Sequence, residues 1–190
     1  RTAEPCWHRL GVEPGKFDFR QLDYEISLAG KHGMKLMLTT GFAPARYGRG
    51  HGNKLAACKP EYYPLYRDYL RKLFDHVPED VIHSVELGNE VDASHVWWVG
   101  DSTPEDYVEE AKMTRFALDR AYPNRKFPFL GFGATWASLE RDRVEGRGRA
   151  WIERAFDAGV DECFDAYSLH YTWSVPKWGF ADWMRGERAK

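Results

Sequence analysis

Cysteine is scarce in this sequence, and the three that occur, Cys6, Cys58 and Cys163, lie far apart. An odd and widely spaced set argues against a disulfide framework and against a CxxC metal site. No hydrophobic run approaches the roughly 20 residues of a membrane-spanning helix. The formal net charge is only -2, so no strong field attracts nucleic acid or an anionic membrane. We therefore expect neither nucleic-acid nor membrane partners.

Aromatic residues, in contrast, are abundant. The 190 residues are 43% hydrophobic and 15% aromatic, with eight tryptophans and ten tyrosines. This content suffices for a hydrophobic core and suggests that residues 1–190 belong to a single domain. Some of the rings should pack in that core. Others offer flat apolar faces of the kind that sugar rings favour for stacking.

Short apolar runs alternate with longer amphipathic segments along the chain. The apolar runs predict strands at 34–39, 81–87, 127–133 and 164–170, with a fifth strand before Trp7. The amphipathic segments predict helices at 19–32, 60–76, 104–122 and 149–158. Alternation of this kind indicates an α/β fold, built from right-handed βαβ units around a parallel sheet.

Two α/β architectures fit this order, a doubly wound sheet and a (β/α)8 TIM barrel. No glycine-rich phosphate-binding motif follows an expected strand, which disfavours the nucleotide-binding alternative. Polar and aromatic residues gather instead after the strand ends, at 39–40, 89–90, 135–136 and 170–171. A barrel enzyme builds its active site at that face, and a whole barrel takes ~250 residues. The sequence therefore predicts most of a barrel but not all of one.

Residues 85–90 read Val-Glu-Leu-Gly-Asn-Glu, a short apolar strand that runs directly into an Asn-Glu pair. Carboxylates rarely occupy the buried end of a strand without a partner or a chemical task. Asn89 can hydrogen-bond a sugar hydroxyl while the carboxyl of Glu90 passes a proton. This order is typical of a retaining glycosidase, in which one carboxyl serves as general acid and then as general base. The alternative interpretation is a solvated glutamate after a strand.

With these residues in place, the chain resembles the large clan of retaining glycoside hydrolases with (β/α)8 barrels, clan A. Residues 86–90 resemble the Glu-x-x-Asn-Glu pattern of its xylosidase-type and iduronidase-type members. Residues 164–171, Phe-Asp-Ala-Tyr-Ser-Leu-His-Tyr, resemble their strand-six segment. Residues 13–23 resemble the turn and helix start after strand two, and residues 32–36 the entry to strand three. The resemblance implies that the chain covers strands two to six, with strands one, seven and eight missing.

The same resemblance implies roles for individual residues. Glu90 is expected as the general acid/base and Asn89 as a ligand of the sugar 2-hydroxyl. The nucleophilic glutamate would follow strand seven, outside this chain. His170 and Tyr171 would contact the sugar, Glu90 or the nucleophile. The tryptophans expected to stack on sugar are those after strand ends, with Trp136 and Trp173 foremost.

Other polar residues near the expected strands receive different interpretations. Glu86 is expected as a buried structural carboxylate that is paired within the barrel. Asp165 lies at the start of a strand, away from the active face, and is rejected as a nucleophile. Glu140 follows strand five and stays an unfavoured but open candidate for a local nucleophile. Trp7 and His8 end the presumed strand two and could line the pocket.

The sequence thus predicts hydrolysis of O-glycosidic bonds in a carbohydrate substrate, with retention of configuration and without a cofactor. One alternative is a non-catalytic carbohydrate-binding barrel that has kept the cleft and lost the nucleophile. Another is a metal-dependent hydrolase that would use His8, His51 and His170 with Glu90. No HxH or HExxH spacing supports such a metal site, so none is expected.

Overall fold

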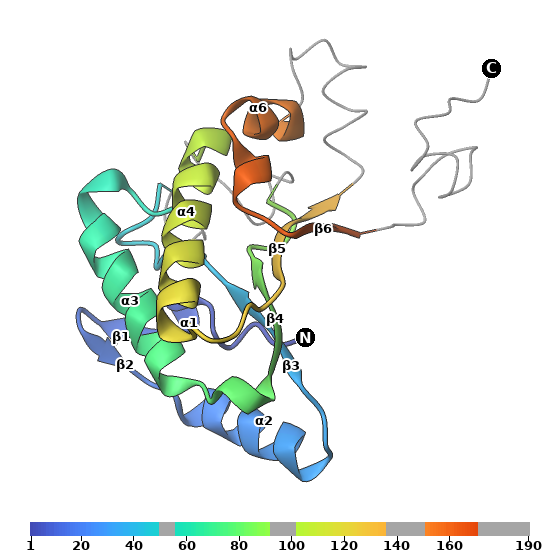
Figure 1. Ribbon diagram of the computed structural model, residues 1–190. Coiled ribbons are helices and arrows are strands. Elements are labelled where there is room, and N and C mark those ends of the chain that lie inside the picture. Colours follow the sequence, from blue (N-terminus) through green and yellow to red (C-terminus); the bar gives the residue numbers. More distant parts are fainter. Residues whose placement is uncertain (50–55, 92–101, 136–150, 171–190) are drawn as a thin grey trace, which may run out of the picture.

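A four-stranded parallel sheet forms the centre of the molecule. The computed structural model describes residues 1–49, 56–91, 102–135 and 151–170. Its strands pair in chain order and are β3 (Leu36–Thr40), β4 (Ile82–Leu87), β5 (Phe129–Thr135) and β6 (Ala166–His170). Figure 1 shows each of them beside the next strand along the chain. This order confirms the parallel α/β arrangement that the alternation predicts.

Helices connect or follow these strands. They are α2 (Arg20–Lys31), α3 (Tyr63–His76), α4 (Pro104–Ala121) and α6 (Trp151–Asp157), with turns of 3-10 helix at Pro60–Tyr62, Glu79–Val81 and Val160–Glu162. Helix α3 packs against α4, and α4 packs against α6, on one side of the strands (Figure 1). None of the helices in the described ranges is long and apolar enough to cross a membrane.

Three strands, β3, β5 and β6, begin two residues later than the sequence pattern predicts, because the residues before them have other roles. The N–H of Met34 donates to the carbonyl of Ala29 at 2.9 Å and so completes the end of α2. Gly33, with φ +63°, makes the left-handed turn that this helix end requires. Before β5, Pro128 has no N–H to give to the sheet. Apolar character alone does not distinguish these residues from the strands that follow.

The expected fifth strand before Trp7 is reduced to one parallel bridge between Thr2 and Leu38. Strand pairing ends there because Pro5 lacks an N–H and the N–H of Cys6 turns back to the carbonyl of Ala3 at 3.1 Å. A short helix and a hairpin follow, α1 (Trp7–Leu10), β1 (Gly11–Glu13) and β2 (Lys16–Phe17). The segment therefore lies where the resemblance expects strand two, beside β3, but contributes little pairing.

The core between helices and sheet is rich in aromatic rings. The largest side chains with almost no exposed surface include Tyr66, Tyr69, Tyr107, Phe74, Phe129 and Phe132. Trp7 is also buried, and its ring stacks on Tyr47 at 5.2 Å and on Tyr69 at 5.6 Å between centroids. The expectation that Trp7 could line the active-site pocket is therefore wrong, since stacking holds this ring in the core.

The hydroxyl of Tyr107, on α4, bridges backbone groups of β4 and β5. It donates to the carbonyl of Leu87 at 2.8 Å and accepts the N–H of Phe132 at 2.7 Å. Direct pairing between β4 and β5 covers only Val85 with Phe129 and Glu86 with Leu130. The phenol thus satisfies backbone groups beyond these pairs that would otherwise be buried without partners. Its position joins α4 to the carboxyl ends of both strands.

Candidate active site

The carboxyl ends of the parallel strands meet at one edge of the sheet, and strained backbone gathers there. Within the described ranges, three non-glycine residues have positive φ angles: Phe42 at 55°, Glu90 at 52° and Phe132 at 77°. They lie just after β3, just after β4 and within β5. Such left-handed conformations cost roughly 1–2 kcal/mol each for residues with a Cβ. They are found mostly where surrounding structure enforces them, often at functional sites.

Glu90 lies at this edge, three residues beyond the end of the central strand β4. Gly88, with φ +78°, turns the chain after the strand. The N–H of Glu90 then donates to the carbonyl of Gly133 at 2.9 Å, which ties the residue to β5. Because positive φ angles interrupt the strand here, side-chain alternation does not extend from Glu86 to Glu90. The turn at Gly88 and the hydrogen bond to Gly133, and not strand alternation, determine the position of Glu90.

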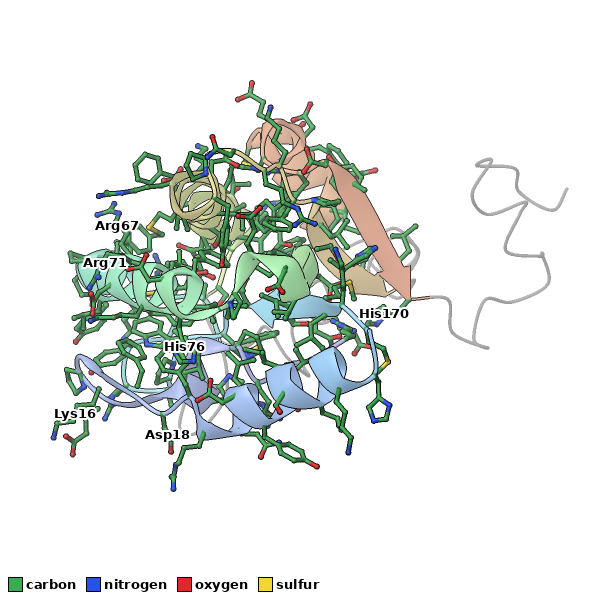
Figure 2. All side chains as sticks on the ribbon, turned by 60° about the horizontal axis from the view of Figure 1, so that its bottom comes forward. Lys16, Asp18, Arg67, Arg71, His76 and His170 are labelled. Carbon is green, nitrogen blue, oxygen red and sulfur yellow. The ribbon has the colours of Figure 1, made fainter. Side chains whose placement is uncertain are left out.

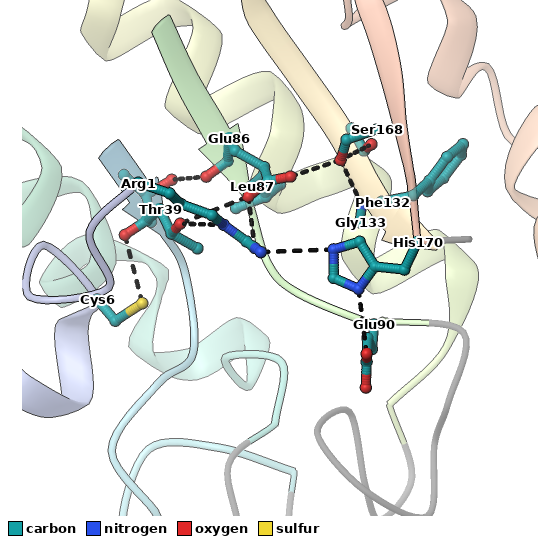
Figure 3. Close-up of polar contacts among 12 residues, drawn as sticks. Arg1, Cys6, Thr39, Glu86, Leu87, Glu90, Phe132, Gly133, Ser168 and His170 are labelled. Atoms are coloured by element: carbon teal, nitrogen blue, oxygen red, sulfur yellow. Dashed lines mark hydrogen bonds and ion pairs between the residues drawn. The ribbon is translucent and has the colours of Figure 1, made fainter. Parts of the chain in front are cut away.

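His170, the last residue of β6, contacts Glu90. Its Nδ1 lies 3.1 Å from Oε1 of Glu90, and the two side chains are 25% and 27% exposed (Figure 3). The structure therefore brings together two of the residues that the sequence analysis singled out, one beyond the end of β4 and one at the end of β6. Tyr171, Trp136 and Trp173, the other predicted sugar contacts, lie outside the described residues, as do Glu140 and His51.

Asn89 lines a cavity of about 320 Å³ beside this edge. The N-terminal segment and β3 also line it, with residues that include Arg1, Cys6, His8, Arg9 and Thr39. Burial lowers the pKa of His8 to about 4, so its ring is neutral at neutral pH. Its Nδ1 has no hydrogen-bond partner within the described part of the chain. The cavity thus presents an amide, a neutral imidazole and a hydroxyl beside the guanidinium groups of Arg1 and Arg9.

Glu86 is buried below the site, with 1% of its side chain exposed. Its Oε2 lies 2.5 Å from Nη2 of Arg1, and its Oε1 accepts the hydroxyl of Ser168 at 2.5 Å. The hydroxyl of Thr39 also faces Oε2 at 3.4 Å. Figure 3 shows these partners on both sides of the carboxylate. The prediction of a buried, paired structural carboxylate is confirmed.

Arg1 is the residue at this site that the sequence analysis did not find. It contacts Glu86, Thr39 and His170. The available signal was indirect, since a buried carboxylate needs a cation or several donors. That requirement does not identify the partner among 27 lysines and arginines.

Asp165 has a structural role at the opposite end of β6. Its Oδ2 accepts the N–H of Phe129 at 2.8 Å and lies 2.5 Å from Nη2 of Arg115. This agrees with its rejection as a nucleophile. Among the described residues, no group of three or more histidines, cysteines or acidic side chains could hold a metal ion.

A larger groove, of about 630 Å³, lies between α3 and α4. Its charged residues include Arg71, which pairs with Asp68 and Asp75. In Figure 2, Arg67 and Arg71 lie across the molecule from His170. The groove is on the helical side and includes none of the strand-end polar residues, so we place the candidate site at the sheet edge instead.

The sequence matches no protein-family model and no curated protein, but solved structures share the fold. A family 39 glycoside hydrolase from Bacteroides cellulosilyticus WH2 is similar over 87% of this chain, with a TM-score of 0.61 and 20% identity. A glucosidase from Croceicoccus marinus is similar over 84%, with a TM-score of 0.61 and 15% identity. Xylanase XynB from Paenibacillus barcinonensis is similar over 96%, with a TM-score of 0.58 and 11% identity.

This chain spans 31%, 31% and 54% of those three chains, respectively. At these identities the likeness concerns the fold alone. The chain folds as part of a (β/α)8 barrel of the kind found in glycoside hydrolases, as the sequence predicted.

Proposed function

We propose that this chain carries the general acid/base of a retaining glycoside hydrolase, and that this residue is Glu90. The observation that carries the proposal is the contact between Glu90 and His170 at the carboxyl edge of the central strand, beside the cavity that Asn89 lines. Barrel enzymes assemble their catalytic groups at that edge. The fold shared with solved glycoside hydrolases supports the same reaction class.

In the proposed reaction, Glu90 donates its proton to the glycosidic oxygen as that bond breaks. A second carboxylate, outside this chain, attacks the anomeric carbon and forms a covalent glycosyl-enzyme. Glu90 then takes a proton from water, whose oxygen attacks the anomeric carbon and releases the sugar and the second carboxylate. These steps need no cofactor.

The remaining predicted residues bind the carbohydrate in this proposal. Asn89 hydrogen-bonds the sugar 2-hydroxyl, and Tyr171 contacts the sugar or the nucleophile. Trp136 and Trp173 stack on sugar rings. Within the clan, the Glu-x-x-Asn-Glu pattern of residues 86–90 is nearest in motif to the xylosidase-type and iduronidase-type members.

The test replaces Glu90 by Gln in the active protein that carries this chain and measures kcat/KM for a series of aryl glycosides. General acid assistance is typically worth ~10²–10⁴-fold. We expect a loss of this size for poor leaving groups. A much smaller loss is expected for activated leaving groups, because they depart with little protonation.

The control is Glu13→Gln, since Glu13 is 56% exposed and pairs with Lys16 in the hairpin. This variant should retain wild-type rates across the series. An equal loss for all leaving groups in Glu90→Gln would show that Glu90 is not the acid. Oligosaccharide binding without turnover by the unaltered protein would favour the non-catalytic carbohydrate-binding barrel.

A further inference from the structure

Arg1 joins three strands of the sheet through one guanidinium group. Its Nε donates to Thr39 of β3 at 3.2 Å, and its Nη2 lies 2.5 Å from Glu86 of β4. Its Nη1 lies 3.4 Å from Nε2 of His170, at the end of β6 (Figure 3). The other nitrogen of the same imidazole, Nδ1, contacts Glu90. Arg1 is therefore linked to Glu90 through the His170 ring.

The chemistry of arginine decides the hydrogen positions along this link. A guanidinium group has donors and no acceptor. The contact with Arg1 therefore requires a lone pair on Nε2 of His170. In a neutral imidazole the proton must then lie on Nδ1, and Nδ1 donates it to Oε1 of Glu90. Without Arg1, and beside a protonated Glu90, the imidazole can hold its proton on either nitrogen.

This arrangement matters most when Glu90 is protonated. An ionised carboxylate accepts from Nδ1–H whatever lies on the far side of the ring. A protonated carboxyl, by contrast, can donate from Oε1 to Nδ1 if the ring carries its proton on Nε2. With Arg1 in place this donation is excluded, because Oε1 of Glu90 must accept the Nδ1–H of His170. The acidic proton of Glu90 is then held on Oε2.

We propose that Arg1 is a positioning residue that fixes the Nδ1–H form of His170 and so reserves Oε2 of Glu90 for the transferable proton. The inference rests on the proposed function for its catalytic meaning. The tautomer itself does not depend on that function, because it follows from the contacts among Arg1, His170 and Glu90 alone.

The test is the ¹⁵N NMR signature of His170 in protein labelled with ¹⁵N-histidine, without substrate. It uses the Glu90→Gln background, which removes the carboxylate that would by itself enforce Nδ1–H. Glu86→Gln is added so that removal of Arg1 leaves no unpaired buried charge. We expect a protonated Nδ1 and an unprotonated Nε2 in Glu90→Gln and in Glu90→Gln/Glu86→Gln. Adding Arg1→Gln should shift the population toward Nε2–H.

Two results would overturn the proposal. One is a His170 already protonated at Nε2 in Glu90→Gln, a conservative variant that leaves Arg1 and Glu86 paired. The other is an unchanged Nδ1–H signature after Arg1→Gln in the double-variant background. The remaining histidines of the chain serve as internal references for the fold. If the leaving-group test fails but the tautomer is confirmed, only the glycosidase role of Glu90 is refuted. If the leaving-group test succeeds but His170 does not depend on Arg1, only the role of Arg1 is refuted.

Discussion

Two glutamates four residues apart occupy contrasting environments at the candidate site. Glu86 is almost fully buried and has an arginine and a serine hydroxyl as close partners. Glu90 is 27% exposed and faces His170. A carboxylate held on both oxygens is suited to fixing neighbouring strands, whereas a partly exposed one can exchange protons with a ligand. The environment, and not the residue type, separates the structural role from the proposed chemical one.

Replacing Glu86 by Ala should destabilise the fold by about 3 kcal/mol. Removal of one partner of a buried ion pair costs roughly 3–5 kcal/mol, and the lower end applies because the side chain of Arg1 is 33% exposed and can reach water. Urea unfolding at neutral pH measures the change. Glu13→Gln, in an exposed pair with Lys16, should change stability by less than about 1 kcal/mol. Equal effects of the two variants would contradict the structural role of Glu86.

The sequence sufficed to predict that the candidate residues in short linear motifs lie near one another. Asn89 and Glu90 follow an apolar strand, and His170 ends another, so their common edge follows from parallel pairing. Arg1 was not predictable in this way, since its partners Thr39, Glu86 and His170 are distant in sequence. Nor was the positive φ of Glu90, because it depends on the backbone bond from Glu90 to Gly133.

At the scale of elements, the turn after β4 depends on a glycine. Gly88 has φ +78°, and a Cβ placed there would lie 2.4 Å from Cγ1 of Val91. Gly88→Ala should therefore destabilise the fold by more than about 1 kcal/mol. Gly30, within α2, has open space around the position of a Cβ, so Gly30→Ala should stabilise by about 0.5–1 kcal/mol. Urea unfolding midpoints that move in the same direction would contradict this pair of predictions.

Helix α4 is tied to the segment after β3 by a buried carboxyl. Oε1 of Glu110 accepts the N–H of Cys58 at 2.6 Å, while its Oε2 has no hydrogen-bond partner among the described residues. Burial raises the pKa of Glu110 to about 8, against 4.5 for the ordinary group, and the nearby Asp106 acts in the same direction. The folded protein therefore keeps this proton up to a higher pH than the unfolded chain.

Because the pKa of Glu110 is raised in the folded state, its contribution to the free energy of unfolding is fully present below pH 4.5. This contribution is lost as the pH rises toward 8. Glu110→Gln removes this titration, so the variant should gain stability relative to the unaltered protein between pH 5 and pH 8. Urea midpoints of both proteins at the two pH values measure it. Glu109→Gln, on the same helix but 51% exposed, should show no such trend. A midpoint difference that does not change with pH would refute the prediction for Glu110.

Element order was predictable from the sequence, whereas element limits were not. Alternation of apolar and amphipathic segments sufficed for the four strands and the helices between them. The N-terminal strand was overestimated because Pro5 and the turn at Cys6 stop its pairing after Thr2. Met34 has strand-like character but completes the end of α2. Local hydrogen bonding, which apolar character does not encode, decided both cases.

At the scale of the whole molecule, the four strands of the parallel sheet and their helices have the fold of part of a barrel. The chain spans 31–54% of the three glycoside hydrolase chains compared above. In the proposed reaction, the nucleophilic carboxylate is expected after strand seven of such a barrel, outside residues 1–190. A retaining mechanism places the two carboxyl groups ≈ 5–5.5 Å apart, whereas inverting enzymes separate them by ≈ 6.5–9.5 Å.

We therefore predict that the active protein releases its first sugar product with the anomeric configuration of the substrate. Formation of the covalent intermediate inverts the configuration at the anomeric carbon once, and its hydrolysis inverts the configuration again. Proton NMR of the anomeric signals, recorded before mutarotation equilibrates them, distinguishes the two outcomes. Initial formation of the opposite anomer would exclude a covalent intermediate, and would give Glu90 a partner that activates water instead.

The phenol of Tyr107 gives α4 a mechanical connection to the proposed catalytic edge. One oxygen makes both the bond to Leu87 and the bond to Phe132. A displacement of α4 that breaks one of these bonds therefore strains the other at the same time. Leu87 lies three residues before Glu90, and Phe132 precedes Gly133, which holds the backbone of Glu90. A force applied to α4 would thus reach both the segment that leads to Glu90 and the segment that holds its backbone N–H.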